Sequence, residues 1–347
     1  MMGVNKVIVN DSIKLDLTAD TVTVSTLKKG VTAHNAAGDI ITGELEGLSG
    51  VGRKDNDKGG VTVTVKSDGN SGGDDLFITY VKSDAGAEIT FLPDSITSIG
   101  TAAFAMHYNM ALTSLPSGVT SIGDYAFMNC PRLALTSLPS GVTSIGEQTF
   151  SACSSLALTS LPAGLTSIGV DAFSDCEGLT LTSLPDNITD IGENAFSGCK
   201  NLALTSLPSG LTNIEANTFF SCTNLSLKSL PDGVTNIGEY AFFGCNNLAL
   251  TSLPSALESI GEYAFCSCIK ITFTSIPSGV ANIDDNAFSA CTGLTTLTFK
   301  GTPETIGAKA FAYCTKLTNI YVPWAEGAVS NAPWGATNAT IHYDSEV

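Results

Sequence analysis

The stretch LTSLPSGVTSIGDYAFMNC, residues 112–130, decides the fold because near copies of it follow at a fixed interval of 23 residues. The copies keep phase without an insertion, and each carries one marker isoleucine and one marker phenylalanine. The isoleucine column is Ile99, Ile122, Ile145, Ile168, Ile191, Ile214, Ile237, Ile260, Ile283 and Ile306. The phenylalanine column is Phe104, Phe127, Phe150, Phe173, Phe196, Phe219, Phe242, Phe265, Phe288 and Phe311. Such a period predicts a solenoid, in which stacked copies bury apolar side chains that one copy cannot bury alone.

Each copy predicts three pieces of local structure. Leu133–Leu138 is expected to form a short strand that ends at a turn, where Pro139 fixes φ and Gly141 accepts positive φ. Val142–Ile145 predicts a second extended piece, and residues 146–153 have a length that suits one or two helical turns. The spacing L-x-L-x-x-L does not fit a strict period of two, so the first strand requires a bulge or bend.

The columns of the repeat follow the order L…L-P-x-x-V-x-x-I-G-x-x-A-F-x-x-C, in which Ile-Gly, Ala-Phe and Cys recur together. Over about residues 88–323 this pattern resembles the leucine-rich repeats of the BspA-like family. The resemblance implies an α+β solenoid with 23-residue, right-handed coils, a parallel β face and terminal caps. It also implies adhesion and protein or cell-surface binding without catalysis.

The charge balance argues against a nucleic-acid partner. Lys and Arg total 16 against 33 Asp and Glu, a net charge of −17, and no basic cluster is present to neutralise phosphates. The opening residues lack the apolar run of a signal peptide, and no stretch approaches the ~20 apolar residues of a membrane-spanning helix. We therefore expect synthesis in the cytoplasm and no membrane partner.

Outside the repeat, the sequence predicts four further segments. Residues 1–47 are expected to form a small β-rich module that includes a hairpin around Asn10-Asp11, and residues 48–60 a Gly-rich, charged linker. Residues 61–91 predict two strands that cap the first coil of a solenoid at 92–323. Residues 324–347 predict a C-terminal cap, because Trp324 and Trp334 provide apolar area to close the other end.

The N-terminal segment carries a second resemblance. Its pattern D-x-T-x-x-T-V…L…G-x-T-A-H-x-x-x-G-x-x-I-T-G is similar to a module of tail and baseplate-associated proteins from phages of Gram-positive gut bacteria. The matching residues are Asp16, Thr18, Thr21, Leu27, Gly30, Thr32, Ala33, His34, Gly38, Ile41, Thr42 and Gly43. The resemblance implies that residues 1–47 contact phage tail or baseplate proteins. It also implies a homotrimer, because fibres commonly assemble as trimers.

Cysteine and histidine do not suggest a metal site or an active site. The cysteine column is Cys130, Cys153, Cys176, Cys199, Cys222, Cys245, Cys268, Cys291 and Cys314, and Cys266 is the one extra cysteine. Its 23-residue spacing is typical of a small apolar residue that fits between coils rather than of a metal cluster. His34, His107 and His342 lie far apart in the sequence, so a shared catalytic site is not expected. The sequence predicts no enzyme, no metal and no cofactor.

An acidic column follows the isoleucine column: Asp124, Glu147, Glu193, Glu239, Glu262 and Asp285. A calcium ladder is one interpretation, but it is interrupted and lacks neighbouring Asp ligands. The favoured interpretation is an acid at the start of a short helix, where exposed N–H groups favour negative charge. A column of serines (Ser114, Ser137, Ser160, Ser183, Ser206, Ser229, Ser252 and Ser275) predicts a polar, solvated strand face.

Four aromatic residues depart from the repeat. Phe220 and Phe243 stand where other copies carry Ser, and Tyr240 and Tyr263 occupy a second, variable position. Adjacent copies place them on neighbouring coils, which predicts either an exposed apolar binding patch or local core packing. If the patch is a binding site, replacing Phe220 and Phe243 by Ser leaves the fold intact.

Two function classes follow from these patterns. The first is a phage or prophage tail protein, either a tail fibre or a receptor-binding protein, located in the virion, whose solenoid contacts a host cell-surface protein or glycan. The alternative is an adhesin on the bacterial cell surface or a protein-interaction scaffold. Both are binding proteins without catalysis.

Overall fold

The computed structural model describes residues 6–9, 14–16, 61–67, 76–83, 89–92, 94 and 96–346, with side chains described from residue 89 onward. The chain divides into two compact units, residues 1–158 and 159–347. Within the described residues, no helix is long and apolar enough to cross a membrane. The predicted domain boundaries stay predictions.

Unit 1 contains one mixed sheet at its N-terminal side. Its strands are β1 (Lys6–Val9), β2 (Lys14–Asp16), β3 (Val61–Ser67), β4 (Leu76–Ser83), β5 (Ile96–Ile99) and β6 (Ser121–Ile122). Unit 1 also contains β7 (Ser144–Ile145), which is not part of this sheet. β1 pairs antiparallel with β2, which confirms the hairpin predicted around Asn10-Asp11. β3 and β4 lie where two strands were predicted, and β4 pairs in parallel with β5 of the first coil. β5 then pairs in parallel with β6.

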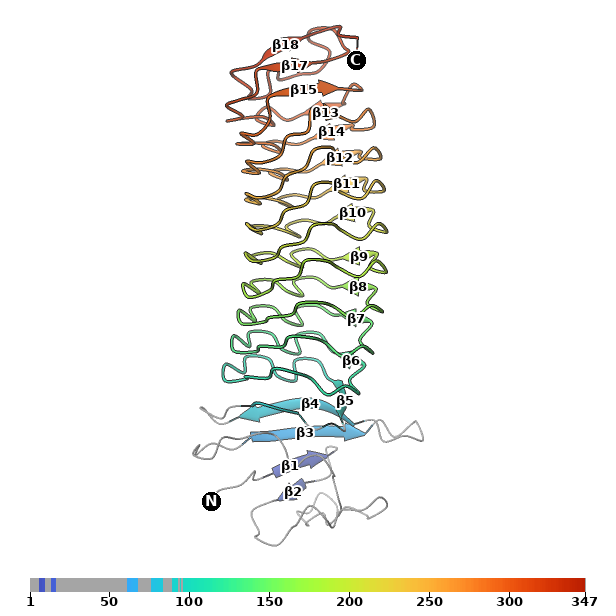
Figure 1. Cartoon of the computed structure of the whole chain (residues 1–347), viewed down its shortest axis with the longest axis vertical. Helices are drawn as coiled ribbons and strands as arrows, with labels where there is room; N and C mark the ends of the chain where they lie inside the picture. Colours follow the sequence, from blue (N-terminus) through green and yellow to red (C-terminus); the bar gives the residue numbers. More distant parts are fainter. Residues whose placement is uncertain are drawn as a thin grey trace. The chain divides into compact units, whose positions relative to one another are not determined.

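Unit 2 is a stack of coils with two rows of parallel strands (Figure 1). The first row consists of β8 (Ser167–Ile168), β9 (Asp190–Ile191), β10 (Asn213–Ile214), β11 (Asn236–Ile237), β12 (Ser259–Ile260), β14 (Asn282–Ile283) and β16 (Thr305–Ile306). The second consists of β13 (Ser275–Ile276), β15 (Thr296–Phe299), β17 (Asn319–Tyr321) and β18 (Thr340–His342). Paired neighbours in the first row are in register at 23 residues, as Ile214 with Ile237, which confirms the predicted 23-residue, parallel-strand solenoid.

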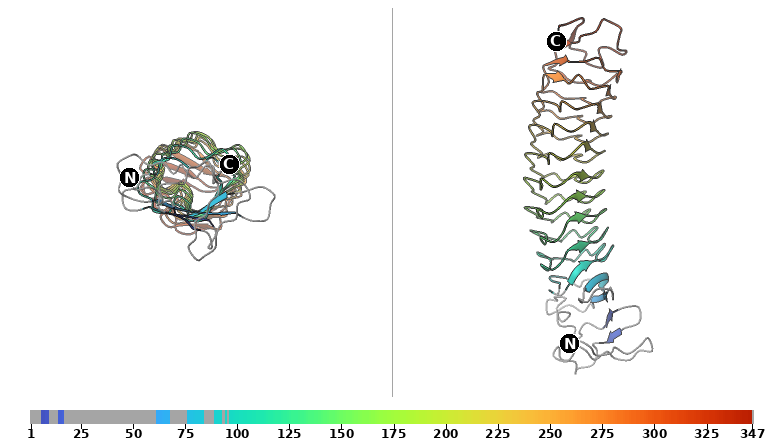
Figure 2. Two further views of the ribbon diagram at one scale, coloured as in Figure 1. Left: turned by 90° about the horizontal axis from the view of Figure 1, so that it is seen from below. Right: turned by 90° about the vertical axis from the view of Figure 1, so that its right-hand side faces the viewer.

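The conserved columns of the repeat form the core. The isoleucine and phenylalanine columns are buried, and within each unit consecutive phenylalanine rings stack almost parallel. Phe219 lies 5.7 Å from Phe196 and 5.4 Å from Phe242 between ring centroids. Because each coil adds one ring to the same row, the period of the sequence becomes a continuous apolar interior, and the coils of unit 2 repeat one shape along the stack (Figure 2).

The helical turns predicted over residues 146–153 and their equivalents are wrong, and the described residues contain no helix. In unit 2, the amides of Asn217, Phe219 and Ser221 each donate to a carbonyl of the next coil, at 2.7–2.9 Å. The amides between them bond three residues back, as Phe220 N to Asn217 O at 3.0 Å. Asn217 and Ser221 have φ of 54° and 56°, a left-handed conformation that a right-handed helix does not contain. Bonding between coils therefore replaces bonding within a helix, and the α+β label does not hold.

The first extended piece of each copy differs from the prediction in most coils. Leu133, Leu135 and Leu138 are all buried, but they lie outside a regular strand and the backbone bends at Thr136. The bend satisfies the L-x-L-x-x-L spacing by turning Leu138 back toward the core. In later copies the spacing changes, as at Leu294, Leu297 and Phe299, and a regular strand forms there as β15.

The C-terminal residues cover the last coils of unit 2. Trp324 and Trp334 are buried and pack against Phe299 at 5.3 and 6.1 Å between ring centroids. The Trp334 indole donates to Ser330 O at 2.7 Å. At the other end of the chain, the residues that resemble a phage module between Thr18 and Gly43 lie outside the described residues.

Candidate binding surface

The four aromatic residues predicted from the repeat contact one another in unit 2 and are called the aromatic patch: Phe220, Tyr240, Phe243 and Tyr263. Phe220 and Phe243 stack 5.1 Å apart at an interplanar angle of 9°. Tyr240 and Tyr263 stack 4.9 Å apart at 7°. The two stacks meet edge to face at Phe220–Tyr240 and Phe243–Tyr263, each 6.4 Å apart at 63°, and Tyr240 and Phe243 lie tilted 5.6 Å apart at 56°. The prediction that these residues lie on neighbouring coils is therefore correct in its geometry, while their role in binding stays a prediction.

The aromatic patch lies at the surface, beside the core rather than in it. Phe219 and Phe242 are fully buried, whereas the next residues, Phe220 and Phe243, are half-buried, as are the two tyrosines. Within each stack, the face of one ring covers the face of the ring on the next coil. The stacking therefore closes the ring faces between Phe220 and Phe243 and those between Tyr240 and Tyr263.

The tyrosines of the patch stand in an unfavourable backbone conformation. Tyr240 and Tyr263 both have φ of 53°. Three other copies carry Asn at this position, as Asn217 at 54° and Asn286 at 57°, and Asn tolerates the left-handed region better than a bulky residue does. The remaining residues with positive φ in this column are Ala102, Tyr125, Gln148 and Asp171. Strain of this kind costs about 1–3 kcal/mol and clusters at functional sites. The two tyrosines are therefore not the residues that backbone geometry favours.

Carboxylates border the patch. Glu239 and Glu262 directly precede the two tyrosines. Partial desolvation raises the pKa of Tyr240, and the charges of Glu262 and Glu239 raise it further, so both carboxylates lie near its phenol. The equivalent pair in unit 1 makes a direct contact, in which the Tyr125 hydroxyl donates to the Glu147 carboxylate. The rim of the aromatic patch is acidic.

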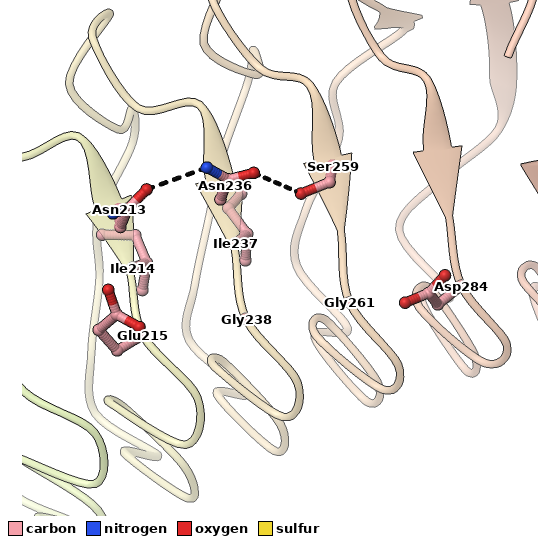
Figure 3. Close-up of a pocket in the computed structure, with 9 residues that line it drawn as sticks. All are labelled: Asn213, Ile214, Glu215, Asn236, Ile237, Gly238, Ser259, Gly261 and Asp284. Atoms are coloured by element: carbon pink, nitrogen blue, oxygen red, sulfur yellow. Dashed lines mark hydrogen bonds between the residues drawn. The ribbon is translucent and has the colours of Figure 1, made fainter. Parts of the chain in front are cut away.

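A polar groove is lined by residues two to four positions before each patch tyrosine, and the sequence did not predict it. Asn236 on β11 donates to Asn213 Oδ1 on β10 at 3.0 Å, and Ser259 on β12 donates to Asn236 Oδ1 at 2.7 Å (Figure 3). Gly238 and Gly261 leave space below this row, and the groove has a volume of about 390 Å³. Its other lining residues include Ile214, Ile237, Glu215 and Asp284.

The two acids of the polar groove stand where neighbouring copies have glycine. The column after the isoleucine is Gly238 and Gly261 in the middle of the groove, with Glu215 and Asp284 on the copies to either side (Figure 3). Partial burial, together with the charge of Asp285, raises the pKa of Asp284. These replacements, and the change from Ser to Asn before the isoleucine, are the signals from which the groove could have been found.

The acidic column has a different explanation from the predicted one. Its residues stand at the start of turns, so a helix dipole does not account for them. In unit 1, Asp124 Oδ1 instead accepts a hydrogen bond from Glu147 N of the next coil at 2.9 Å. Within the described residues, no group of three or more His, Cys, Asp or Glu side chains is placed to hold a metal ion.

The cysteine column lies inside the stack. All ten cysteines are free and buried. Cys222 Sγ donates to Phe196 O at 3.0 Å, and the same contact joins Cys245 to Phe219. Burial raises the pKa of the Cys222 and Cys245 thiols, and it raises that of Cys130 to about 12. The thiols thus remain protonated donors between coils at neutral pH, a contact that the sequence pattern does not reveal.

The two described histidines each contact a different aromatic residue, and the serine column is a separate surface feature. His107 of unit 1 packs edge-on against Phe104, 6.1 Å away between ring centroids. His342 of unit 2 stacks on Tyr321 at 4.4 Å and bonds Asn319 Oδ1 at 3.0 Å. His34 lies outside the described residues. The serine column is exposed over most of its length, as predicted for a solvated face.

Comparison with known proteins establishes the family. The model described as a BspA type leucine-rich repeat region matches residues 83–203 and 212–327, more than half of the chain. The chain belongs to this BspA-type leucine-rich repeat family. No curated protein matches it.

Several solved structures are similar to the chain. A leucine-rich repeat protein of T. pallidum is 31% identical, with 50% of this chain and 83% of that chain covered and a TM-score of 0.40. A leucine-rich cell surface protein of Faecalibacterium prausnitzii is 26% identical, covering 76% and 95%, with a TM-score of 0.36. A leucine-rich repeat protein of Bacteroides ovatus is 22% identical, covering 81% and 98%, with a TM-score of 0.43.

Proposed function

We propose that this BspA-type protein is a non-catalytic binding protein that contacts a partner protein through the aromatic patch and polar groove of unit 2. The strained tyrosines carry the proposal. Tyr240 and Tyr263 adopt φ of 53° at a position where most other copies carry Ala, Gln, Asp or Asn, and only Tyr125 of unit 1 repeats the tyrosine there, so most coils form without an aromatic residue at this position. A feature that the fold does not need, and that has a conformational cost, is typical of a contact site.

The shape and composition of the surface support a macromolecular partner. The polar groove is open, and the aromatic patch adds half-buried rings on the same coils. Clustered aromatic residues surrounded by polar groups are enriched at the centres of protein interfaces. A cell-surface location for the partner is part of the proposal, because adhesion is what the family resemblance implies.

The attachment of residues 1–47 to a phage tail, the homotrimer and a location in the virion stay predictions. The family match begins at residue 83, and most residues of that N-terminal resemblance lie outside the described residues. The binding role of unit 2 is the same in a virion and on a cell surface.

The test uses a variant that carries the residues of neighbouring copies: Phe220→Ser, Phe243→Ser, Tyr240→Asn and Tyr263→Asn. We expect this variant to keep the circular dichroism spectrum of the parent and to lose a partner that the parent retains from extracts of bacterial and epithelial cell-surface proteins. A parent and a variant that retain identical proteins would contradict the proposal. Unfolding of the variant under assay conditions would instead assign the patch to the core.

A further inference from the structure

We propose that the segment recognised by the aromatic patch is an extended, Lys- or Arg-rich stretch of the partner protein, which lies over the ring edges and pairs with Glu239 and Glu262. This inference rests on the proposed binding function and adds the chemistry of the partner. It follows from which parts of the rings are free and from the sign of the charge around them.

The stacking decides how a cationic side chain contacts the patch. A cation above a ring face needs to approach within about 6 Å of the ring centroid. The faces between Phe220 and Phe243 are closed, because these rings lie 5.1 Å apart and nearly parallel. The ring edges are apolar surface against which the methylene stem of Lys or Arg packs while its charged head extends beyond.

The acidic rim provides the partner for that charged head. Glu239 and Glu262 lie next to the tyrosines of the patch, and the charge of each raises the pKa of the Tyr240 phenol. They sit on adjacent coils, one strand spacing or about 4.8 Å apart. Two basic side chains of one extended segment therefore reach both carboxylates, with their stems on the rings between the segment and the core.

Charge over a wider area selects the same class of partner. Glu215 and Asp284 line the polar groove on these coils, and Asp285 continues the acidic column. The whole chain carries a net charge of −17. An acidic segment would be repelled by every one of these groups, whereas a basic segment is attracted at long range and then held by the apolar contact.

The experiment selects a random dodecapeptide display library on the full chain and removes peptides that also bind the variant with Ser at 220 and 243 and Asn at 240 and 263. We expect the remaining peptides to be enriched in Lys and Arg. Enrichment of neutral or acidic peptides would overturn the basic-segment proposal and leave the binding function standing. If no peptide depends on the patch, both proposals fail.

Titration of one selected peptide then separates a local contact from general attraction. We expect the double variant Glu239→Gln, Glu262→Gln to weaken binding roughly five-fold at physiological ionic strength, a size typical of two exposed ion pairs. Glu193→Gln is the matched control, because Glu193 is in the same column but its copy carries Asn194 and Ser197 in place of the patch aromatics. Equal weakening by the control would overturn the proposed pairing with Glu239 and Glu262.

Discussion

Phe219 and Phe220 are consecutive residues with opposite surroundings, so replacing each by Ser measures where the core ends. Phe219 is fully buried and stacks between Phe196 and Phe242. Phe220 is half-buried in the aromatic patch and stacks on Phe243. The two variants change the same atoms at neighbouring positions of one coil, and each serves as the control for the other.

The expected losses differ because the buried areas differ. Removing a fully buried Phe ring costs about 4 kcal/mol, and the buried Ser hydroxyl at 219 adds about 1 kcal/mol. At 220 roughly two-thirds or more of a ring of about 200 Å² is buried, and at 25 cal/mol per Å² its removal costs about 2.5 kcal/mol after allowance for a compact unfolded state. We therefore expect Phe219→Ser to be more destabilising than Phe220→Ser by about 2.5 kcal/mol.

Urea unfolding followed by circular dichroism measures this difference. With a slope of about 3 kcal/mol per molar urea, the two midpoints separate by about 1 M. Because arrays of repeats can lose cooperativity, hydrogen exchange of residues 213–245 gives a second, local readout. Equal losses for the two variants would refute the reasoning, since they would show that Phe220 belongs to the core and that the aromatic patch is packing rather than a surface.

Three further predictions concern the interior. Gly238→Ala is expected to destabilise the protein, because a Cβ there lies 2.6 Å from Ala216 N, whereas Gly164→Ala has no neighbour within 4 Å and is expected to be neutral or slightly stabilising by urea midpoint. Burial raises the pKa of the Cys130 and Cys314 thiols from 9.0 to about 12. The unfolded chain therefore releases these protons near pH 9 and the folded chain near pH 12. Stability is then complete below pH 9 and falls by about 1.4 kcal/mol per pH unit and thiol between these values, so a flat urea midpoint from pH 8 to 11 would contradict this. At pH 8 the same thiols are expected to react with Ellman's reagent only after unfolding, and rapid labelling of the native protein would exclude their buried placement.

The periodic part of the fold was predictable because its information is local and repeated. The isoleucine and phenylalanine columns determine which side chains face inward, and stacking at 23 residues follows from their fixed phase. The positions of β3 and β4 were also predictable, because alternation of apolar and polar residues at 61–67 and 76–83 indicates strands directly. The grouping of the four aromatic residues followed from the same period.

The helical turns were not predictable from segment length, and the reason is the hydrogen bonding between coils. At 217–222 alternate amides leave the segment to bond the next coil, an arrangement that exists only once a neighbour is present. A short peptide of this sequence has no such partner. Length and apolar spacing therefore predicted a helix, because a helix satisfies the backbone amides within one segment. In the stack, hydrogen bonds to the next coil form instead, and the segment adopts turns with left-handed residues at Asn217 and Ser221.

The sequence alone determined the solenoid, its period, its core columns and the adjacency of Phe220, Tyr240, Phe243 and Tyr263, because each depends on repetition along the chain. Only the tertiary structure decided which faces of those rings are used, that two tyrosines hold φ of 53°, and that Asn213, Asn236 and Ser259 form one polar row. Those properties depend on distances and backbone angles between residues 23 positions apart. The stacking of the coils sets these distances and angles, so they cannot be read from the type of any single residue.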